Sequence, residues 1–195
     1  LGIGLLVGVG VGIIAYVRGT TSTKENDARS ETTATDSSNS PYPYGPLLIY
    51  FGSQTGTAEG FARTLMEEGR DIGFDTTSLD LEDFNADALC EAKNAIFLMA
   101  TYGEGEPTDN AVDFSSWVEN KENNLAADHL KGVRFNVFGL GNRQYEHYNR
   151  MGKLTDKRLS ALGAQRSYDL GEGDDDGTLE EDFDSWKTDL WPSML

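Results

Sequence analysis

The sequence predicts an α/β protein built on a five-stranded parallel sheet with helices on both faces. Two observations predict this class. From residue 47 onwards, short apolar runs alternate with longer segments in which apolar residues recur at helical spacing. The central runs are apolar almost throughout, as expected of strands buried on both faces. Right-handed crossovers between parallel strands then place the helices in two layers.

The strands are predicted from these apolar runs in chain order. Residues 47–51 and 95–100 are entirely apolar and residues 133–138 mostly so, which indicates the centre of the sheet. Residues 76–81 are more polar and fit an edge strand, and residues 166–170 form the last predicted strand.

The helices are predicted from periodicity and from their stop signals. In residues 58–72, apolar side chains such as Phe61 and Leu65 recur near helical spacing, and Gly73 ends the helix. A second clear helix stops at Gly163. The remaining predicted helices, together with that one, span residues 86–92, 112–119, 151–162 and 179–190.

The first 17 residues carry no charge and are almost all Leu, Ile, Val and Gly. A bilayer core needs about 20 apolar residues, with a lower limit near ~17. We therefore expect residues 1–18 to be a transmembrane anchor whose beginning precedes this sequence, which does not start with Met. A signal peptide or a buried core helix is the alternative.

The positive charges Arg18, Lys24 and Arg29 follow the apolar run, so the positive-inside rule predicts a cytosolic location for what comes next. Residues 19–45 are rich in Ser and Thr and fit a flexible linker. Residues 46–195 then form the globular domain.

Composition excludes several classes of function. The chain has 33 acidic and 16 basic residues, a net charge of −17, which argues against a nucleic-acid-binding protein. Its one cysteine, Cys90, excludes a disulfide framework and any multi-thiolate metal site. Two histidines leave little material for a histidine metal centre.

In parallel sheets, ligands bind beyond the carboxyl ends of the strands, so the loops after the first, third and fourth strands are the candidate site. The first loop, residues 52–58 (GSQTGTA), offers hydroxyls and a helix start to a phosphate. It has no lysine, so it is not a Walker A loop, and it lacks the dinucleotide-binding glycine pattern. It suits a single phosphate group, or alternatively a Ser/Thr helix cap.

The other two loops each offer an aromatic ring. Tyr102 follows the third strand in residues 101–110, and Tyr145 follows the fourth in residues 139–149. Two tyrosines from neighbouring loops can hold a flat ring between them, although a lone loop tyrosine is commonly just a surface residue. A phosphate loop and two aromatic walls at one sheet edge indicate a flavin mononucleotide (FMN) site.

Five segments, SQTGTAE, ATYGEGEPTDNA, FGLGNRQYEHYN, LGAQR and LGEGDDDGTLEEDF, closely resemble the flavodoxin-like domain of the NADPH-cytochrome P-450 reductase family. The resemblance covers residue 47 to the C-terminus and implies a flavodoxin-like sheet of order 2-1-3-4-5. Glu106 and Tyr148 depart from the residues expected in many relatives, Asp and Phe. Neither departure touches the phosphate loop or the two stacking tyrosines.

The resemblance also implies a set of FMN-binding residues, with no catalytic or metal-binding residue among them. Tyr102 and Tyr145 are implied to stack on opposite faces of the flavin ring. The implied residues are Ser53, Gln54, Thr55, Gly56, Thr57, Ala58, Ala100, Thr101, Tyr102, Gly103, Leu140, Gly141, Asn142, Arg143, Gln144, Tyr145, Glu146, His147, Tyr148, Asn149 and Asp175.

The implied function is electron transfer from NADPH, through FAD in a C-terminal domain outside this sequence and then through FMN, to cytochrome P-450 and other haem proteins. The resemblance further implies an anchor in the endoplasmic reticulum membrane and a cytosolic domain. A free-standing, membrane-tethered flavodoxin-type carrier and a non-flavin module on the same fold are the alternatives. The acidic residues expected to dock the haem proteins are Asp174, Asp175, Asp176, Glu180, Glu181 and Asp182.

Overall fold

The computed structural model describes residues 40–119 and 123–195. The predicted anchor at residues 1–18 and most of the predicted linker at residues 19–45 lie outside the described residues. Within the described part of the chain, no helix is long and apolar enough to cross a membrane.

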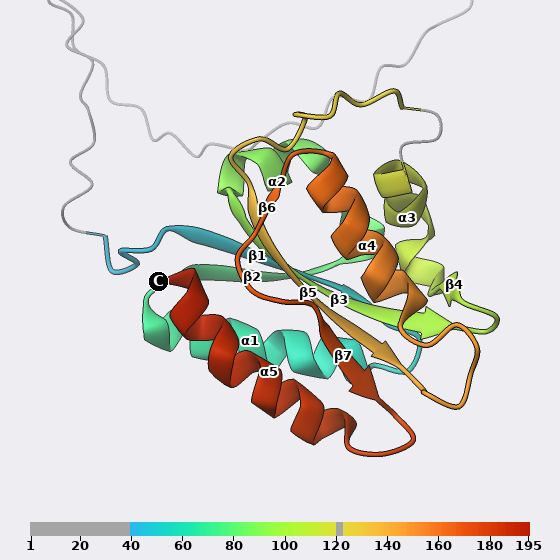
Figure 1. The fold of residues 1–195 in the computed structure, drawn as a ribbon. Coiled ribbons are helices and arrows are strands. Elements are labelled where there is room, and N and C mark those ends of the chain that lie inside the picture. The colour runs from blue at the N-terminus through green and yellow to red at the C-terminus, as the bar shows by residue number, and fades with distance from the viewer. Residues whose placement is uncertain (1–39, 120–122) are drawn as a thin grey trace, which may run out of the picture. The chain divides into compact units, whose positions relative to one another are not determined.

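Four long strands form the parallel centre of the sheet: β1 (Pro46–Gly52), β2 (Asp75–Asp80), β3 (Asn94–Tyr102) and β5 (Arg134–Gly141). They lie in the order β2-β1-β3-β5, as Figure 1 shows. The register pairs Leu48 with Ala95 and Phe97 with Val137, so the apolar runs lie side by side. The flavodoxin-like α/β fold and its strand order are confirmed over these four positions.

The fifth position of the sheet differs from the prediction of one strand at residues 166–170. Two short parallel strands occupy it, β6 (Gln165–Arg166) beside the start of β5 and β7 (Gly171–Asp174) beside its end. Between them the backbone N–H of Tyr168 donates to the side-chain Oδ1 of Asn136, 2.8 Å away. The prediction of one strand at residues 166–170 is thus corrected to two strands, and the Asn136 side chain bridges the break between them.

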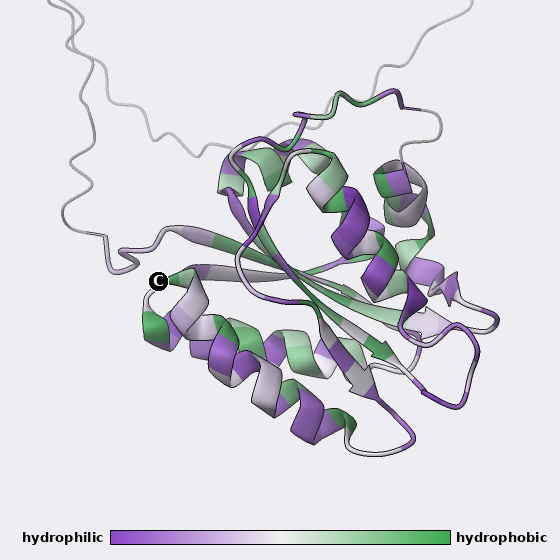
Figure 2. Cartoon of the chain, viewed as in Figure 1, coloured by the Kyte–Doolittle hydropathy of each residue, from purple (hydrophilic) through white to green (hydrophobic). Residues whose placement is uncertain are grey.

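The helices cover both faces of the sheet, as predicted (Figure 1). Helices α1 (Thr57–Ile72) and α5 (Leu179–Met194) pack on one face, and α2 (Ala86–Ala92), α3 (Val112–Glu119) and α4 (Arg150–Ala161) pack on the other. The connections add a two-residue strand, β4 (Glu106–Pro107), and the short 3₁₀ helices η2 (Leu81–Asp83) and η3 (Asp109–Ala111). Figure 2 shows the apolar residues concentrated on the central strands and on the inner sides of the helices.

Alternation along the strands divides the core into two layers. In β1, Ile49 belongs to the layer under α1 and α5, whereas Tyr50 belongs to the opposite layer. Aromatic stacking fills each layer: Phe97 stacks on Tyr50, while Phe183 stacks on Phe61 with ring centroids 4.0 Å apart. This packing fixes the strands, and therefore the loops at their carboxyl ends.

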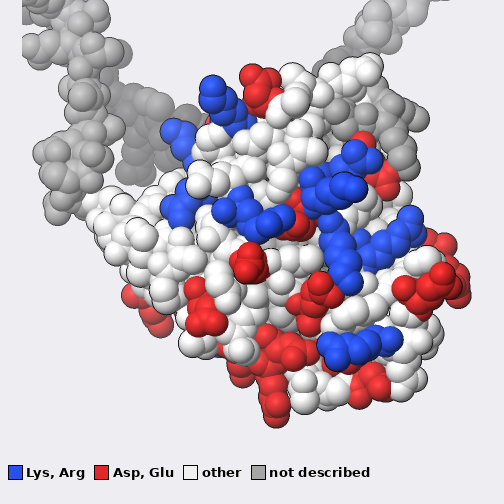
Figure 3. Space-filling model, viewed as in Figure 1, with Lys and Arg blue, Asp and Glu red and all other residues white. Residues whose placement is uncertain are grey.

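Charge is unevenly distributed along the chain. Residues 131–166 contain eight basic and two acidic residues, which leaves eight basic and 31 acidic residues for the rest of the chain's 16 and 33. Figure 3 shows Lys and Arg gathered over the part of the face where α4 lies, with Asp and Glu along the lower edge. On this face, therefore, basic and acidic residues are concentrated in different parts.

Candidate functional site

A cavity of about 460 Å³ lies at the carboxyl ends of β1, β3 and β5, between the three predicted loops. Such a volume is within the range of small-molecule sites. All but four of the predicted site residues line it, the four being Gly56, Arg143, Gln144 and Glu146. The cavity is also lined by three residues outside the predicted set, namely Glu104, Thr108 and Leu179.

The first loop presents an open helix start to the cavity. The residue before α1 is Gly56, with a left-handed φ of 92° and no side chain that caps the helix. The Ser53 hydroxyl accepts the Gly56 N–H at 3.0 Å, but among the described residues no Ser or Thr side chain caps the first turn of α1. The first-turn N–H groups of α1 have no partner within the helix, and the Thr55 and Thr57 hydroxyls lie 3.4 Å apart beside them. This arrangement suits an anion.

Neighbouring side chains hold the first loop in place. Asn110 Oδ1 accepts hydrogen bonds from the Ser53 backbone N–H at 3.0 Å and from the Thr108 hydroxyl at 2.7 Å. Asn110 Nδ2 donates to Asp80 at 2.9 Å, and the Gln54 side chain donates to Asp109 Oδ2 at 3.2 Å. Asn110 was given no role from sequence, yet it joins three segments under the phosphate loop.

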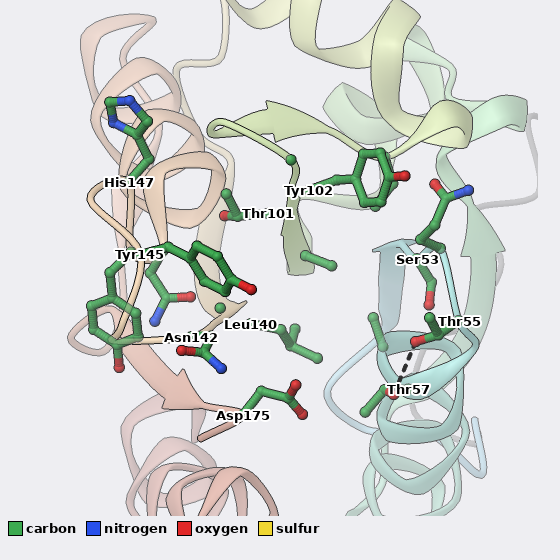
Figure 4. Close-up of a pocket in the computed structure, with 18 of the residues that line it drawn as sticks. Ser53, Thr55, Thr57, Thr101, Tyr102, Leu140, Asn142, Tyr145, His147 and Asp175 are labelled. Atoms are coloured by element: carbon green, nitrogen blue, oxygen red, sulfur yellow. Dashed lines mark hydrogen bonds between the residues drawn. The ribbon is translucent and has the colours of Figure 1, made fainter. Parts of the chain in front are cut away.

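Two exposed tyrosines flank the cavity. The side chains of Tyr102 and Tyr145 are 53% and 67% exposed, respectively, unusual values for large aromatics beside a cavity. Figure 4 shows both beside the same space, with the hydroxyls of Ser53, Thr55 and Thr57 on one side of it. Among the ring contacts of the described residues, none joins Tyr102 to Tyr145. Their rings are thus available to a flat ligand.

A tight hairpin sets the position of Tyr102. Tyr102 pairs with Glu106 across the antiparallel β3–β4 pair, and the Gly105 N–H donates to the Tyr102 carbonyl at 3.0 Å. Gly103 and Gly105 have φ values of 49° and 96°, which side chains rarely adopt. Arg150 at the start of α4 donates to the Gly105 carbonyl at 3.0 Å and holds the turn from the other side.

Asn149 closes the third loop at the start of α4. It is fully buried, has a left-handed φ of 53°, and its Nδ2 donates to the Gly173 carbonyl at 3.0 Å. A Cβ on Gly139 or Gly141 would lie 2.9 Å from its Oδ1, so both glycines are needed for this approach. That buried Oδ1 has no hydrogen-bond partner among the described residues, which leaves an acceptor at the cavity wall.

The acidic loop after β7 completes the site. The Asp175 N–H donates to the Gly141 carbonyl at 2.8 Å, and Figure 4 shows the Asp175 carboxylate directed into the cavity. The Arg143 N–H donates to the neighbouring carboxylate of Asp174 at 2.9 Å and is the main cause of the lowered pKa of Asp174. Of the residues predicted for docking, Asp175 thus faces the cavity, whereas the Asp174 carboxylate accepts a hydrogen bond from the chain itself.

Three of the six acidic residues predicted for docking accept hydrogen bonds from within the domain. They are Asp174, Asp176 and Asp182. Asp175 lines the cavity. Glu180 and Glu181 are exposed at the start of α5, and their carboxylates accept no hydrogen bond from the described residues.

The residues around the cavity fit an aromatic cofactor that ends in one phosphate. Exposed rings face one part of the cavity, and an uncapped helix start with two hydroxyls faces another. The family model described as Flavodoxin matches residues 49–186. The chain belongs to the flavodoxin family. Solved flavodoxin structures agree: a mutant flavodoxin from Pseudomonas aeruginosa matches with a TM-score of 0.64 at 23% identity, over 76% of this chain and 98% of that one.

The curated relatives place this flavodoxin domain more narrowly. It is 51% identical over 153 residues to the NADPH–cytochrome P-450 reductase of Homo sapiens and 48% identical over 147 residues to that of Dictyostelium discoideum. These matches cover 76% and 75% of this chain, but the chain spans only 22% of the length of either relative. They confirm the predicted resemblance and support FMN as the cofactor of this domain, whereas FAD and NADPH belong to another domain of the relatives.

Proposed function

We propose that this flavodoxin domain is the electron-delivering part of a membrane-anchored NADPH–haemoprotein reductase. Electrons from NADPH reach FMN through FAD in a further domain, and FMN passes them to cytochrome P-450 and other haem proteins. The observation that carries the proposal is the pair of exposed tyrosines beside an uncapped helix start, in a chain about half identical to P-450 reductases.

The proposal extends to the organisation of the chain. Residues 1–18 form a single-pass anchor in the endoplasmic reticulum membrane, residues 19–45 form a flexible linker, and residues 46–195 form the cytosolic FMN-binding domain. The uncharged start of the sequence and the three cations that follow it support this arrangement.

Bound FMN supplies the ability to accept and release electrons, and the chain supplies binding and orientation. The first-turn N–H groups of α1 and the hydroxyls of Ser53, Thr55 and Thr57 bind the phosphate through hydrogen bonds and the helix dipole. No cation lies in this loop, so the backbone dipoles carry the charge of the phosphate.

The aromatic walls orient the flavin ring and exclude water from its faces. Tyr102 would stack on one face and Tyr145 on the other, each contributing about 0.5–1.5 kcal/mol beyond the area it buries. The carboxylates of Asp175 and Glu104 also line the cavity. Their negative charge disfavours extra charge on the ring, so it favours passing the electron onward.

Uptake of FMN by the purified chain tests the proposal directly. We expect a yellow protein that quenches FMN fluorescence, and Tyr145→Ala should weaken FMN binding by about three- to tenfold because it removes one stacking face. Tyr44→Ala is the matched control, since Tyr44 is an exposed tyrosine that contacts Phe74 away from the cavity. A colourless protein that takes up no FMN would contradict the proposal.

Delivery of electrons tests the second half of the proposal. The FMN-loaded chain, reduced with dithionite and freed of excess reductant, should reduce ferric cytochrome c in stopped-flow mixing. Because docking on an acidic surface is electrostatic, added salt should slow this transfer while leaving transfer to a small neutral acceptor unchanged. Equal salt dependence for both acceptors would count against docking by charge.

A further inference from the structure

The loop that carries Tyr145 is tied to the acidic loop that follows β7. The Arg143 N–H donates to Asp174 Oδ1 at 2.9 Å, and Arg143 Nε lies 3.5 Å from Asp174 Oδ2. Gln144 Nε2 donates to Asp176 Oδ2 at 2.6 Å. Arg143 and Gln144 immediately precede Tyr145 and do not line the cavity, so their contacts serve the loop itself.

A second tie follows Tyr145 in the chain. The Tyr148 hydroxyl donates to the Glu172 carbonyl at 3.0 Å, and Asn149 Nδ2 donates to the Gly173 carbonyl at 3.0 Å. Tyr145 is therefore bracketed by bonds to residues 172–176. Because Tyr145 itself is 67% exposed, the bonds of its neighbours determine where its backbone lies.

The carboxylate of Asp174 is occupied by these internal bonds. It also accepts the Asp176 N–H at 3.2 Å, and its side chain is only 15% exposed. An incoming protein has little access to such a group. Glu180 and Glu181, in contrast, are exposed, and their carboxylates accept no hydrogen bond from the described residues.

We propose that Asp174 and Asp176 are positioning residues that hold the Tyr145 loop at the cofactor cavity, and that they are not docking residues for the haem protein. The carboxylates act through Arg143 and Gln144, and the favourable bonds account for the lowered pKa of Asp174. The effect on the cofactor rests on the proposed function, whereas the tie itself is a property of the cofactor-free chain.

The first test uses the cofactor-free chain and amide hydrogen exchange. Asp174→Ala and Asp176→Ala should each speed exchange at residues 143–145 by about tenfold, because a charge-assisted hydrogen bond contributes on that order. Glu180→Ala and Glu181→Ala remove the same charge nearby and should leave exchange at these residues unchanged. Asp174 is the last residue of β7, so its replacement could also disturb the sheet. Asp176 is exposed and outside the strand, so Asp176→Ala tests the same tie without altering the sheet.

A double-mutant cycle then isolates the contact. Gln144→Ala, Asp176→Ala and the double variant should all accelerate exchange to the same extent, since each removes the same hydrogen bond. Additive effects would show that the two side chains act separately and would overturn the tie.

The second test adds FMN. The Asp174 and Asp176 variants should bind FMN about tenfold more weakly and quench its fluorescence less, while the Glu180 and Glu181 variants should retain both properties and transfer electrons to cytochrome c more slowly at low salt. The opposite pattern, with normal exchange and FMN binding but slowed transfer in the Asp174 and Asp176 variants, would refute the proposal. If no variant and no parent chain binds FMN, the proposed function fails, and the exchange measurements still decide the tie.

Discussion

Replacing Gly152 with alanine tests how closely α4 packs on the strand that leads into the site. A Cβ at Gly152 would lie 2.8 Å from the Cα and 3.2 Å from the backbone N of Gly139 in β5. Backbone atoms of a central strand cannot rotate away, so α4 has to move. The start of α4 carries Asn149 and Arg150, so this movement would also disturb the cavity.

The expected size of the effect combines two terms of opposite sign. Glycine in a helix is less favourable than alanine by about 0.5–1 kcal/mol, which alone would stabilise the variant. Forcing an extra methyl group into a packed interface costs about 1–3 kcal/mol. We therefore expect Gly152→Ala to lower the free energy of unfolding by about 1 kcal/mol, and at most by about 2.5 kcal/mol.

The control is a glycine in another helix with nothing around it. A Cβ at Gly60 in α1 meets no heavy atom within 4 Å, so Gly60→Ala should raise the free energy of unfolding by about 0.5–1 kcal/mol. Urea or thermal unfolding of the cofactor-free chain, followed by circular dichroism, measures the stability change of both variants. Each kcal/mol should shift Tm by about 2–4 °C. A Gly152→Ala variant that is stabilised as much as Gly60→Ala would refute the close contact.

Three further predictions follow from individual side chains. Burial raises the pKa of Tyr50 to about 12, so only the unfolded chain ionises this group between pH 10 and 12, and the free energy of unfolding should fall as pH rises through this range. Tyr50→Phe removes a buried hydroxyl that has no partner among the described residues, so its free energy of unfolding at pH 7 should be within about 1 kcal/mol of that of the parent. In urea titrations between pH 10 and 12, the free energy of unfolding of this variant should fall less than that of the parent. The pKa of Asp174 is lowered mainly by the Arg143 N–H, so the ionised carboxylate should stabilise the fold above the ordinary carboxyl pKa range, and this stabilisation should be lost as pH falls through the lowered pKa. In Asp174→Asn, the free energy of unfolding should therefore depend less on pH in the acid range. Replacing Glu180 and Glu181 together with glutamine should slow low-salt electron transfer to cytochrome c by about threefold and have no effect at high salt, and a loss that persists at high salt would argue against electrostatic docking.

The central sheet and most helices could be predicted because their signals are local. Continuous apolar runs marked β1 and β3, and α3 was predicted with the bounds that the structure gives it. A strand at the fifth position of the sheet was predicted, but its division into β6 and β7 could not be, because β7 has the sequence GEGD and carries no apolar signal. Its glycines are required by packing: a Cβ at Gly171 would lie 2.3 Å from Phe138, and one at Gly173 would lie 2.3 Å from Leu179.

The candidate site was predictable where topology alone brings residues together. Loops that follow neighbouring parallel strands meet at one edge, and Ser53, Tyr102 and Tyr145 from three such loops line one cavity. The support of these loops was not predictable. Asn110 joins three segments through its side-chain amide, and the partners of that amide are set by the tertiary fold.

The interruption between β6 and β7 beside β5 also affects whether strands of two molecules can pair at high concentration. A long, regular edge strand offers its free N–H and C=O groups to a strand from another molecule, which is a common route to fibrous aggregates. Here β6 has two residues and β7 has four, and the chain between them leaves the ladder to bond with the Asn136 side chain. An incoming chain therefore finds no long, straight strand to pair with on this edge of the sheet.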